Sequence, residues 1–257
     1  MDGAREVNGM AVVDGLLRER GLVRPDEVWV HGMWTPDKWL RCVMAKLRGK
    51  TLVRMTHQGL SPICLARRSP WKKRLVAPLE RLLFAISDRI VVTGPWEEEW
   101  NRAWGLKGPF ETIDLRQFFD LSRPTRRPDL SGGRPLRVLY LGRRHPLKGV
   151  GELEEAVGGL DAGRVELRVE THVFGAEKEA AWEWCDVLCL PTLSENFGLV
   201  VAEALERGKP VVVTDGAPAW SDLREDQGVY VRGYRDGTRG ERVALLRRAL
   251  KAFVSGK

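Results

Sequence analysis

The sequence has few of the features that mark secreted or membrane-spanning proteins. Only four of its 257 residues are cysteines, and their spacing matches neither a disulfide framework nor a zinc site. No apolar run approaches the roughly 20 residues that a membrane-spanning helix needs. A signal peptide is not expected either, because no charged start followed by a short apolar core precedes the first predicted elements. We therefore expect a cytoplasmic protein.

Further absences narrow the function. The chain has no internal repeat and no low-complexity segment, which argues against a solenoid or a disordered tail. It has no Asp-x-Asp pair of the kind that holds a divalent metal, so we expect no metal and no other cofactor. A net charge of +7 indicates an anionic partner. No recognisable nucleic-acid motif accompanies that charge, so nucleic acid is not the expected partner.

The densest positive charge lies between residues 67 and 84, where cations alternate with Trp and Leu. Such a mixture is typical of a segment that meets anionic lipid. The candidate membrane-contact residues are Arg67, Arg68, Trp71, Lys72, Lys73 and Arg74. A solvated helix whose apolar side faces a sheet has the same pattern, and Pro78 argues against one uninterrupted helix. Both interpretations remain open at this point.

Apolar runs of strand length alternate with helical stretches in the first half of the chain, after a helical stretch from Val7 to Arg20. The predicted strands are Glu27–His31, Thr51–His57, Arg89–Thr93 and Phe110–Ile113. This alternation predicts a parallel α/β sheet.

A polar segment rich in proline and glycine, residues 122–135, separates two such halves. The length of the chain suits two small domains. We predict a first domain over residues 1–121 and a second over 136–238, followed by a final helical segment over 239–257. The second domain should contain strands at 137–142, 165–169 and 186–192.

The most informative stretch runs from Ser194 to Leu205 and holds two glutamates with seven residues between them. It joins the buried strand at 186–192, stopped by proline, to a helix predicted over 198–207. Free amides at such a helix start bind anions. Glu195 would lie in the loop beside the anion, and Glu203 would lie where a carboxylate can accept hydrogen bonds from sugar hydroxyls. The pattern indicates a nucleotide-diphosphate sugar, although two glutamates at this spacing also occur on solvated helices.

A second loop places two cations at the end of a strand. The strand at 137–142 leads into Arg143 and Lys148, and a helix follows from about Val150 to Val157. A diphosphate leaving group needs such charge compensation, particularly where no metal supplies it. A solvated basic loop would look the same when taken alone.

Together the two segments resemble the retaining glycosyltransferases of family 4, the group 1 transferases of the two-domain GT-B fold. The motifs that carry the resemblance are Gly142-Arg143, Pro146, Lys148-Gly149, Leu190-Pro191-Thr192, Glu195-x7-Glu203 and Gly208-Lys209-Pro210-Val211-Val212. Residues 173–179 and 214–218 are similar to the branch that builds lipopolysaccharide and other bacterial surface glycans. The resemblance covers most of residues 136–224.

The resemblance implies two Rossmann-like domains facing a cleft, with residues 239–257 crossing back onto the first domain. It implies transfer of a sugar, with retention of anomeric configuration, from a UDP- or GDP-linked donor to a glycan or lipid-linked acceptor. The enzyme would work at the inner face of the cytoplasmic membrane, with an anionic membrane surface as a partner.

The resemblance also assigns roles to residues. The catalytic candidates are Glu195 and His57. The donor-binding candidates are Arg143, Lys148, Asn196, Phe197, Gly198, Leu199 and Glu203. The acceptor-cleft candidates, which follow two strands of the first half, are His31, Trp34, Gln58 and Gly59. A lone histidine after a strand is more often a structural residue, and a surface-packed role suits Trp34 equally well.

The chain departs from the family pattern in its first half. The usual opening strand with a Gly-Gly loop is missing, the first strand is reached only near Val28, and residues 114–117 replace the usual Asn-Gly. At 257 residues the chain is short, so both domains are expected to be trimmed. Two other functions stay open: a non-catalytic or partner-dependent nucleotide-sugar-binding subunit, and an epimerase or phosphorylase of the same architecture, which does not typically combine both motifs.

Overall fold

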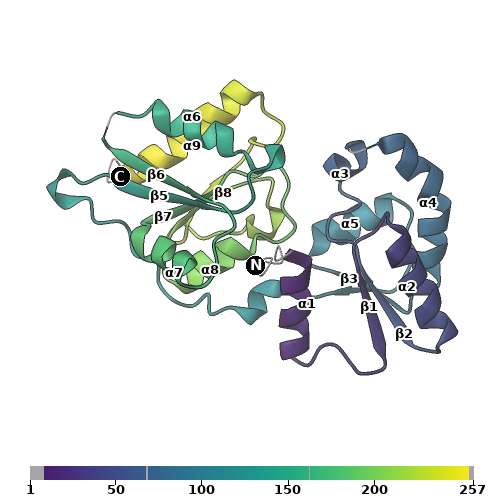
Figure 1. Cartoon of the computed structure of the whole chain (residues 1–257). Coiled ribbons are helices and arrows are strands. Elements are labelled where there is room, and N and C mark those ends of the chain that lie inside the picture. Colours follow the sequence, from purple (N-terminus) through teal and green to yellow (C-terminus); the bar gives the residue numbers. More distant parts are fainter. Residues whose placement is uncertain (1–8, 68, 162, 255–257) are drawn as a thin grey trace, which may run out of the picture. The chain divides into compact units, whose positions relative to one another are not determined.

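The protein consists of two compact units, Met1–Leu115 and Arg116–Lys257, each with its own parallel sheet (Figure 1). The computed structural model describes residues 9–67, 69–161 and 163–254. The boundary between the units falls before the predicted end of the first domain at residue 121. Residues of the predicted linker bond to the second unit: the amide of Arg126 donates to the carbonyl of Gly208 at 3.0 Å, and Arg134 pairs with Asp186 at 2.6 Å.

The first unit contains the four strands that the sequence predicts. They are β1 (Glu27–His31), β2 (Thr51–Met55), β3 (Arg89–Val92) and β4 (Phe110–Thr112), in the order β1-β2-β3-β4. All neighbouring pairs are parallel, and His31 stands opposite Met55. Strand β2 ends two residues earlier than predicted, which leaves Thr56 and His57 in the loop at the carboxyl edge of the sheet.

Helices cover both faces of this sheet. Helix α1 (Gly9–Glu19) lies on the opposite side of the strands from α2 (Pro36–Leu47) and α4 (Pro70–Ala85), as Figure 1 shows. The remaining helices are α3 (Pro62–Ala66) and α5 (Pro95–Ala103). Cys42 of α2 and Leu83 of α4 share one apolar core with Val30 and Leu52 of the strands. Helices α2 and α4 therefore pack on the same face of the sheet.

Helix α4 continues through Pro78, which corrects the expectation that this proline interrupts it. Proline lacks the amide that would donate to the carbonyl of Arg74 one turn earlier. Pro78 is exposed, so water can satisfy that carbonyl. Another proline, Pro70, begins the helix, at a position where no intrahelical donor is needed.

The second unit contains a five-stranded parallel sheet in the order β6-β5-β7-β8-β9. Its strands are β5 (Leu136–Leu141), β6 (Val165–Glu170), β7 (Val187–Leu190), β8 (Val211–Thr214) and β9 (Gly228–Val231). The chain passes from β5 to β6 on one side and then returns to β7 on the other. The carboxyl ends of β5 and β7 therefore form a topological switch point, where ligands bind in open α/β sheets.

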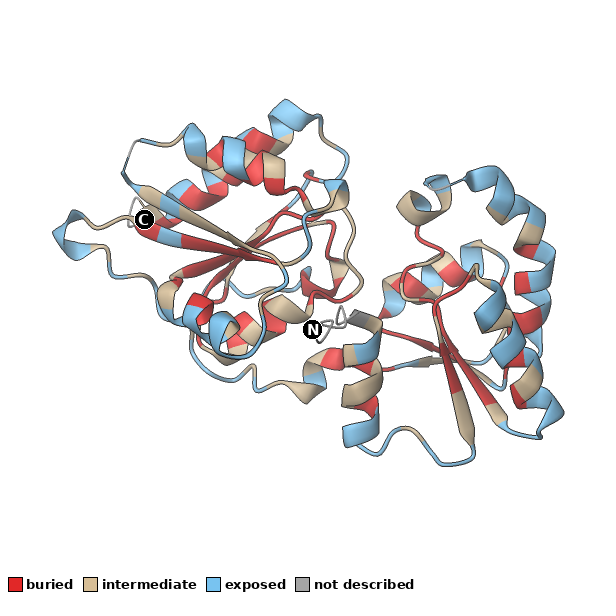
Figure 2. Cartoon of the chain, in the orientation of Figure 1, coloured by how far each residue is buried: buried red, intermediate tan, exposed pale blue. Residues whose placement is uncertain are grey.

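The central strands of the second unit are buried on both faces (Figure 2), as expected for a parallel sheet covered by helices. Helices α6 (Val150–Gly158) and α9 (Arg239–Val254) lie on one side, with α7 (Gly175–Trp184) and α8 (Leu199–Glu206) on the other (Figure 1). The buried side chains of α9 belong to the core of this unit. Within the described ranges no helix has the length and apolar character required to cross a membrane.

Candidate active site

The loop after β5 is held in place by its own polar groups. The hydroxyl of Tyr140 donates to the carbonyl of Arg143 at 2.8 Å, and Nδ1 of His145 accepts from the amide of Leu147 at 3.2 Å. Burial raises the pKa of Tyr140, so its hydroxyl stays a donor. The loop then makes one turn of 3₁₀ helix, Pro146–Lys148, before α6 begins. Lys148 is thus fixed at the carboxyl end of β5.

Gly149 brings this loop against the loop after β7. It has the left-handed φ of +64°, and a Cβ at this position would lie 1.9 Å from the carbonyl oxygen of Pro191. Just beyond, the amide of Leu193 donates to the carbonyl of Leu147 at 2.7 Å. Only glycine permits such close approach. In the Lys148-Gly149 pair of the sequence motif, the glycine therefore lets the two loops touch and the lysine supplies the positive charge.

The loop after β7 is also fixed from its other side. The amide of Glu195 donates to the carbonyl of Gly216, beyond β8, at 2.8 Å. A Cβ on Gly216 would lie 2.0 Å from the carbonyl of Thr192, so glycine is again required. The hydroxyl of Thr192 accepts from the amide of Ser194 at 3.3 Å. Both ends of the Glu195 loop are therefore anchored to neighbouring strand ends.

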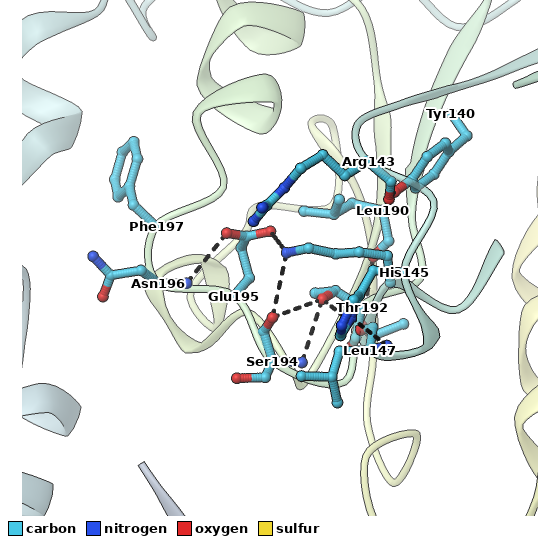
Figure 3. Close-up of polar contacts among 12 residues, drawn as sticks. Tyr140, Arg143, His145, Leu147, Leu190, Thr192, Ser194, Glu195, Asn196 and Phe197 are labelled. Carbon is cyan, nitrogen blue, oxygen red and sulfur yellow. Dashed lines mark hydrogen bonds and ion pairs between the residues drawn. The ribbon is translucent and has the colours of Figure 1, made fainter. Parts of the chain in front are cut away.

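The two loops meet in an ion pair between Lys148 and Glu195. Nζ of Lys148 lies 2.5 Å from Oε2 of Glu195, and the two side chains are only 16% and 22% exposed. The amide of Asn196 donates to Oε1 of the same carboxylate at 3.3 Å. Figure 3 shows the side chain of Arg143 directed toward this carboxylate. The structure thus gathers two cations and one carboxylate at the switch point, an arrangement with a net positive charge.

Phe197 and Gly198 build the start of α8. The ring of Phe197 packs against Phe119 and Trp220, with ring centroids 6.3 Å and 5.3 Å apart, and Nε1 of Trp220 donates to the carbonyl of Phe197 at 2.5 Å. Gly198 has a left-handed φ of +79°, and α8 begins at Leu199. The side chain of Phe197 is therefore part of the packing.

Glu203 lies on α8 and pairs with a cation that the sequence analysis did not predict as part of the site. Its Oε2 lies 2.7 Å from Nζ of Lys178, which belongs to α7, and the two side chains are 21% and 27% exposed respectively. Lys178 lies in the 173–179 segment, which contributed to the prediction only as part of a family resemblance. Nothing in the spacing of the sequence indicates that α7 and α8 meet at this pair.

In the first unit, the ends of β1 and β2 bring His31 and His57 together. Nδ1 of His31 and Nε2 of His57 are 2.7 Å apart, and the rings stack with centroids separated by 5.0 Å. Asp14 of α1, which sequence reasoning missed, lies 3.3 Å from Nε2 of His31. Burial lowers the pKa of His57 to about 3, and burial also lowers the pKa of His31 although Asp14 opposes that shift. Both rings are therefore neutral near pH 7.

A buried glutamate, Glu97 of α5, shapes the loop that carries His57. His57 and Gln58 both have left-handed φ angles, 46° and 61°, which are costly for residues other than glycine. One oxygen of Glu97 accepts from the hydroxyl of Thr56 at 2.7 Å and from the amide of Gln58 at 2.9 Å. Gln58 is only 5% exposed, so its side chain belongs to the interior. Glu97 was not predicted, because a glutamate in the first turn of a helix usually faces solvent.

Trp34, an acceptor-cleft candidate, is fixed to the body of the first unit. Its amide donates to Oε1 of Glu80 at 2.5 Å, and its indole donates to the carbonyl of Gly59 at 3.4 Å. Glu80 is fully buried and pairs with Arg54 at 3.1 Å. Trp34 lines a pocket of about 520 Å³ together with Pro62, Leu65, Ala66, Pro70, Lys73, Arg74, Ala77, Arg81 and Trp104. This pocket combines apolar walls with cationic side chains.

The membrane-contact candidates separate into two groups. Arg67, Trp71, Lys72 and Arg74 are exposed, whereas the ammonium of Lys73 donates to the carbonyls of Cys64 and Arg67 and so satisfies the end of α3. Arg68 lies outside the described residues. Among the residues that the structure describes, no three His, Cys, Asp or Glu side chains cluster in a way that could hold a metal ion.

Two protein-family models match the chain. Residues 134–238 match the model described as glycosyl transferases group 1, and residues 3–115 match the glycosyl transferase 4-like domain. The sucrose-phosphate synthase of Thermosynechococcus elongatus has a similar structure, with 18% identity, a TM-score of 0.62, and coverage of 95% of this chain and 69% of that chain. The chain is a glycosyltransferase of the GT-B fold.

Two further solved structures resemble this glycosyltransferase. Anabaena HepE, in complex with UDP and glucose, has 17% identity and a TM-score of 0.63 over 95% of this chain and 73% of that chain. The lipopolysaccharide outer core galactosyltransferase WaaB has 15% identity and a TM-score of 0.57 over 95% of this chain and 70% of that chain. No curated protein sequence matches the chain. The predicted α/β class with two Rossmann-like domains and a short chain is confirmed.

Proposed function

We propose that this glycosyltransferase is a retaining enzyme of family 4 that uses a nucleoside-diphosphate sugar, UDP- or GDP-linked, as its donor. The observation that carries the proposal is the Lys148–Glu195 pair at the switch point of the second sheet. HepE was solved with UDP and glucose, and its fold is similar to that of this chain, which supports the choice of donor class.

The diphosphate is assigned to the cations of the β5 loop and to the start of α8. Arg143 and Lys148 would offset its charge, and the amides of Gly198 and Leu199 would donate to its oxygens from a helix N-terminus. The cations supply the charge that a divalent metal would supply in a metal-dependent transferase, so we propose transfer without a metal or other cofactor.

The nucleoside and the sugar are assigned to the two glutamates. Glu203 would accept hydrogen bonds from ribose hydroxyls, with Lys178 holding its carboxylate in position. Glu195 would lie beside the transferred sugar, where its charge stabilises the positive character that develops as the glycosidic bond breaks. Lys148, paired with Glu195, would stabilise the opposite charge on the departing diphosphate.

His57 is assigned a hydrogen bond to a hydroxyl of the transferred sugar. Because burial keeps the pKa of His57 at about 3, its ring is neutral at pH 7 and acts as a hydrogen-bonding group rather than as a cation. His31 would orient the ring of His57 through the contact between their ring nitrogens, and Asp14 would hold His31 in place from the other ring nitrogen.

The acceptor is assigned to the first unit and is proposed to be a glycan or a lipid-linked molecule of the bacterial surface-glycan type. The pocket beside Trp34 supports this class, because its apolar walls and its cations Lys73, Arg74 and Arg81 suit an anionic amphipathic molecule. WaaB, which has a similar fold, is named as a lipopolysaccharide galactosyltransferase. We place the enzyme at the inner face of the cytoplasmic membrane.

A calorimetric screen of UDP- and GDP-linked sugars in excess chelator tests the proposal. We expect one donor to bind, and Arg143→Met to weaken that binding. Consumption of the bound donor in the presence of lipid extract would distinguish an enzyme from a donor-binding subunit that lacks activity alone. Binding that strictly requires magnesium or manganese, or no binding of any nucleotide sugar, would contradict it.

A further inference from the structure

Helix α4 has an apolar face that its packing does not use. The side chains that it turns inward include Ala77, Leu83 and Phe84, each at most 9% exposed. A second set of large apolar residues recurs every three or four positions along the opposite side of the helix and remains exposed. It comprises Trp71 at 64%, Leu75 at 74%, Leu79 at 39%, Leu82 at 60% and the capping residue Ile86 at 36%. This spacing forms one continuous stripe.

Helix α2 carries a similar exposed stripe. Leu40, Val43 and Leu47 are 62%, 42% and 76% exposed, whereas Cys42 and Ala45 of the same helix are buried against the sheet. Residues three and four apart lie on one side of a helix, so these three also form a stripe. Neither stripe contributes to the core of the first unit.

The two stripes lie on one outer surface. Helices α2 and α4 pack on the same face of the first sheet, and each stripe lies opposite the side that its helix turns to that sheet. Figure 2 shows both helices exposed on the side away from the strands. These eight residues, which we call the outer α2–α4 surface, include most of the exposed large hydrophobic side chains among the described residues. Such concentration marks an interaction surface rather than scattered exposure.

Positive charge surrounds this surface. Arg48, Lys50, Lys72 and Arg74 are exposed on α2, α4 and the chain next to them. The acidic residues of the same segments are fewer, and two of them are ion-paired. Glu80 is buried and pairs with Arg54, and Asp88 pairs with Lys46 at 2.9 Å. Nζ of Lys72 lies 5.4 Å from the ring centroid of Trp71. A lysine so placed can lay its apolar stem along the stripe while its charge stays in water.

The charge selects the partner. Two copies of this chain joined through the outer α2–α4 surface would bring like charges together, which disfavours association. Anionic lipid headgroups match the cations, and the boundary between headgroups and acyl chains accepts the apolar stripes. We infer that the outer α2–α4 surface binds the first unit to a membrane that contains anionic lipid.

The sequence predicts a candidate lipid-contacting segment at residues 67–84, with individual candidates only between 67 and 74. The structure adds the apolar stripe of α2 and shows which residues of α4 stay exposed. The inference deepens the proposed membrane location and needs neither donor nor acceptor. Failure of lipid binding is therefore distinguishable from failure of glycosyl transfer, because vesicle binding is measured without substrates.

The test is sedimentation of the full-length protein with vesicles of phosphatidylglycerol and phosphatidylcholine. We expect binding to phosphatidylglycerol vesicles that weakens between 0.1 and 0.5 M salt, as Debye screening predicts when the screening length falls below about 10 Å. The combined variant Leu47→Gln, Leu75→Gln, Leu82→Gln should bind at least about tenfold more weakly, because exposed leucines supply the buried apolar area. Leu22→Gln, which changes an apolar residue 38% exposed elsewhere in the unit, is the matched control and should bind normally.

Charge is tested separately with Arg48→Gln and Lys72→Gln. Each should weaken vesicle binding about fivefold, the equivalent of about 1 kcal/mol for a cation near an anionic surface. Melting temperatures and light scattering accompany every variant. Equal binding to vesicles of pure phosphatidylcholine would overturn the inference, and so would a folded leucine variant with unchanged lipid binding. A wild-type dimer that the leucine substitutions convert to monomers, without vesicle binding, would assign the surface to a second copy instead.

Discussion

Opposite effects of two substitutions on nucleotide affinity would test the roles of Lys148 and Glu195. Their charged atoms are 2.5 Å apart, and both side chains are largely buried, so each substitution changes the charge that the diphosphate meets. Lys148→Met keeps the apolar stem and removes the ammonium. The loss of one hydrogen bond to a charged group costs about 1.5–3 kcal/mol, and the dissociation constant of the nucleoside diphosphate should therefore rise roughly 10- to 150-fold.

Glu195→Gln keeps the size of the side chain and removes a negative charge beside the same diphosphate. Affinity for the nucleoside diphosphate should therefore stay equal or increase. The ammonium of Lys148 would then no longer pair with a carboxylate and could interact with the diphosphate alone. Turnover should nevertheless fall by about 100-fold or more, as it does when one group that stabilises transition-state charge is lost. Both variants should lower turnover while moving affinity in different directions.

Calorimetry with UDP and GDP, followed by initial rates with the preferred donor, measures both effects. Near-ultraviolet circular dichroism and melting temperature confirm that each variant is folded. If Glu195→Gln weakens nucleoside-diphosphate binding as much as Lys148→Met does, the carboxylate contacts the nucleotide itself and the two roles are wrongly assigned.

Three further predictions concern the sites and their supports. Glu203→Ala should weaken nucleotide affinity by about 1.5–3 kcal/mol, measured by calorimetry, and an unchanged affinity would remove the ribose from Glu203. Gly149→Ala should lower the stability by about 1–3 kcal/mol from its left-handed backbone alone, with more from the contact with Pro191, whereas Gly158→Ala, which meets nothing within 4 Å, should be neutral or stabilising in the same urea titration. Since the pKa of folded His57 is about 3 and that of an unfolded histidine about 6.5, acid below pH 6.5 favours the unfolded state by about 1.4 kcal/mol per pH unit down to pH about 3. His57→Gln should reduce that slope, and an unchanged slope would show that His57 titrates normally.

The strands of both sheets were largely predictable because buried parallel strands are short apolar runs with sharp ends. The predicted strand at 186–192 contains β7, for example, and its proline falls just after Leu190 as expected. Strand β8 was not predicted, although its Val-Val run was noted as part of a motif, and neither was β9, three of whose four residues are only partly buried. Short strands of this kind gain their stability from neighbours that are distant in sequence.

The candidate site was predictable where its residues lie in loops that follow parallel strands, and not where a side chain on a helix pairs with another element. Arg143, Lys148 and Glu195 lie in the loops that follow strands β5 and β7, so the parallel arrangement predicts that they share an edge of the sheet. Lys178 of α7 pairs with Glu203 of α8, and Glu97 of α5 accepts from Thr56 in the loop after β2. No local sequence pattern indicates that these elements meet. The exposed stripe of α2 was also missed, and residues 67–84 were left open between lipid contact and packing on a sheet. A pattern of leucines on a helix predicts packing but not which side of the helix is left uncovered.

The central claim is that a nucleotide-sugar donor bound at the β5–β7 switch point gives up its sugar with retention. Proton NMR of the anomeric signals during transfer tests it most directly, using the donor that the binding screen selects and a lipid-linked acceptor in excess chelator. We predict a product with the same anomeric configuration as the donor, formed by the wild type and formed much more slowly by Lys148→Met. A product of inverted configuration, or equal rates for the wild type and Lys148→Met, would contradict the account.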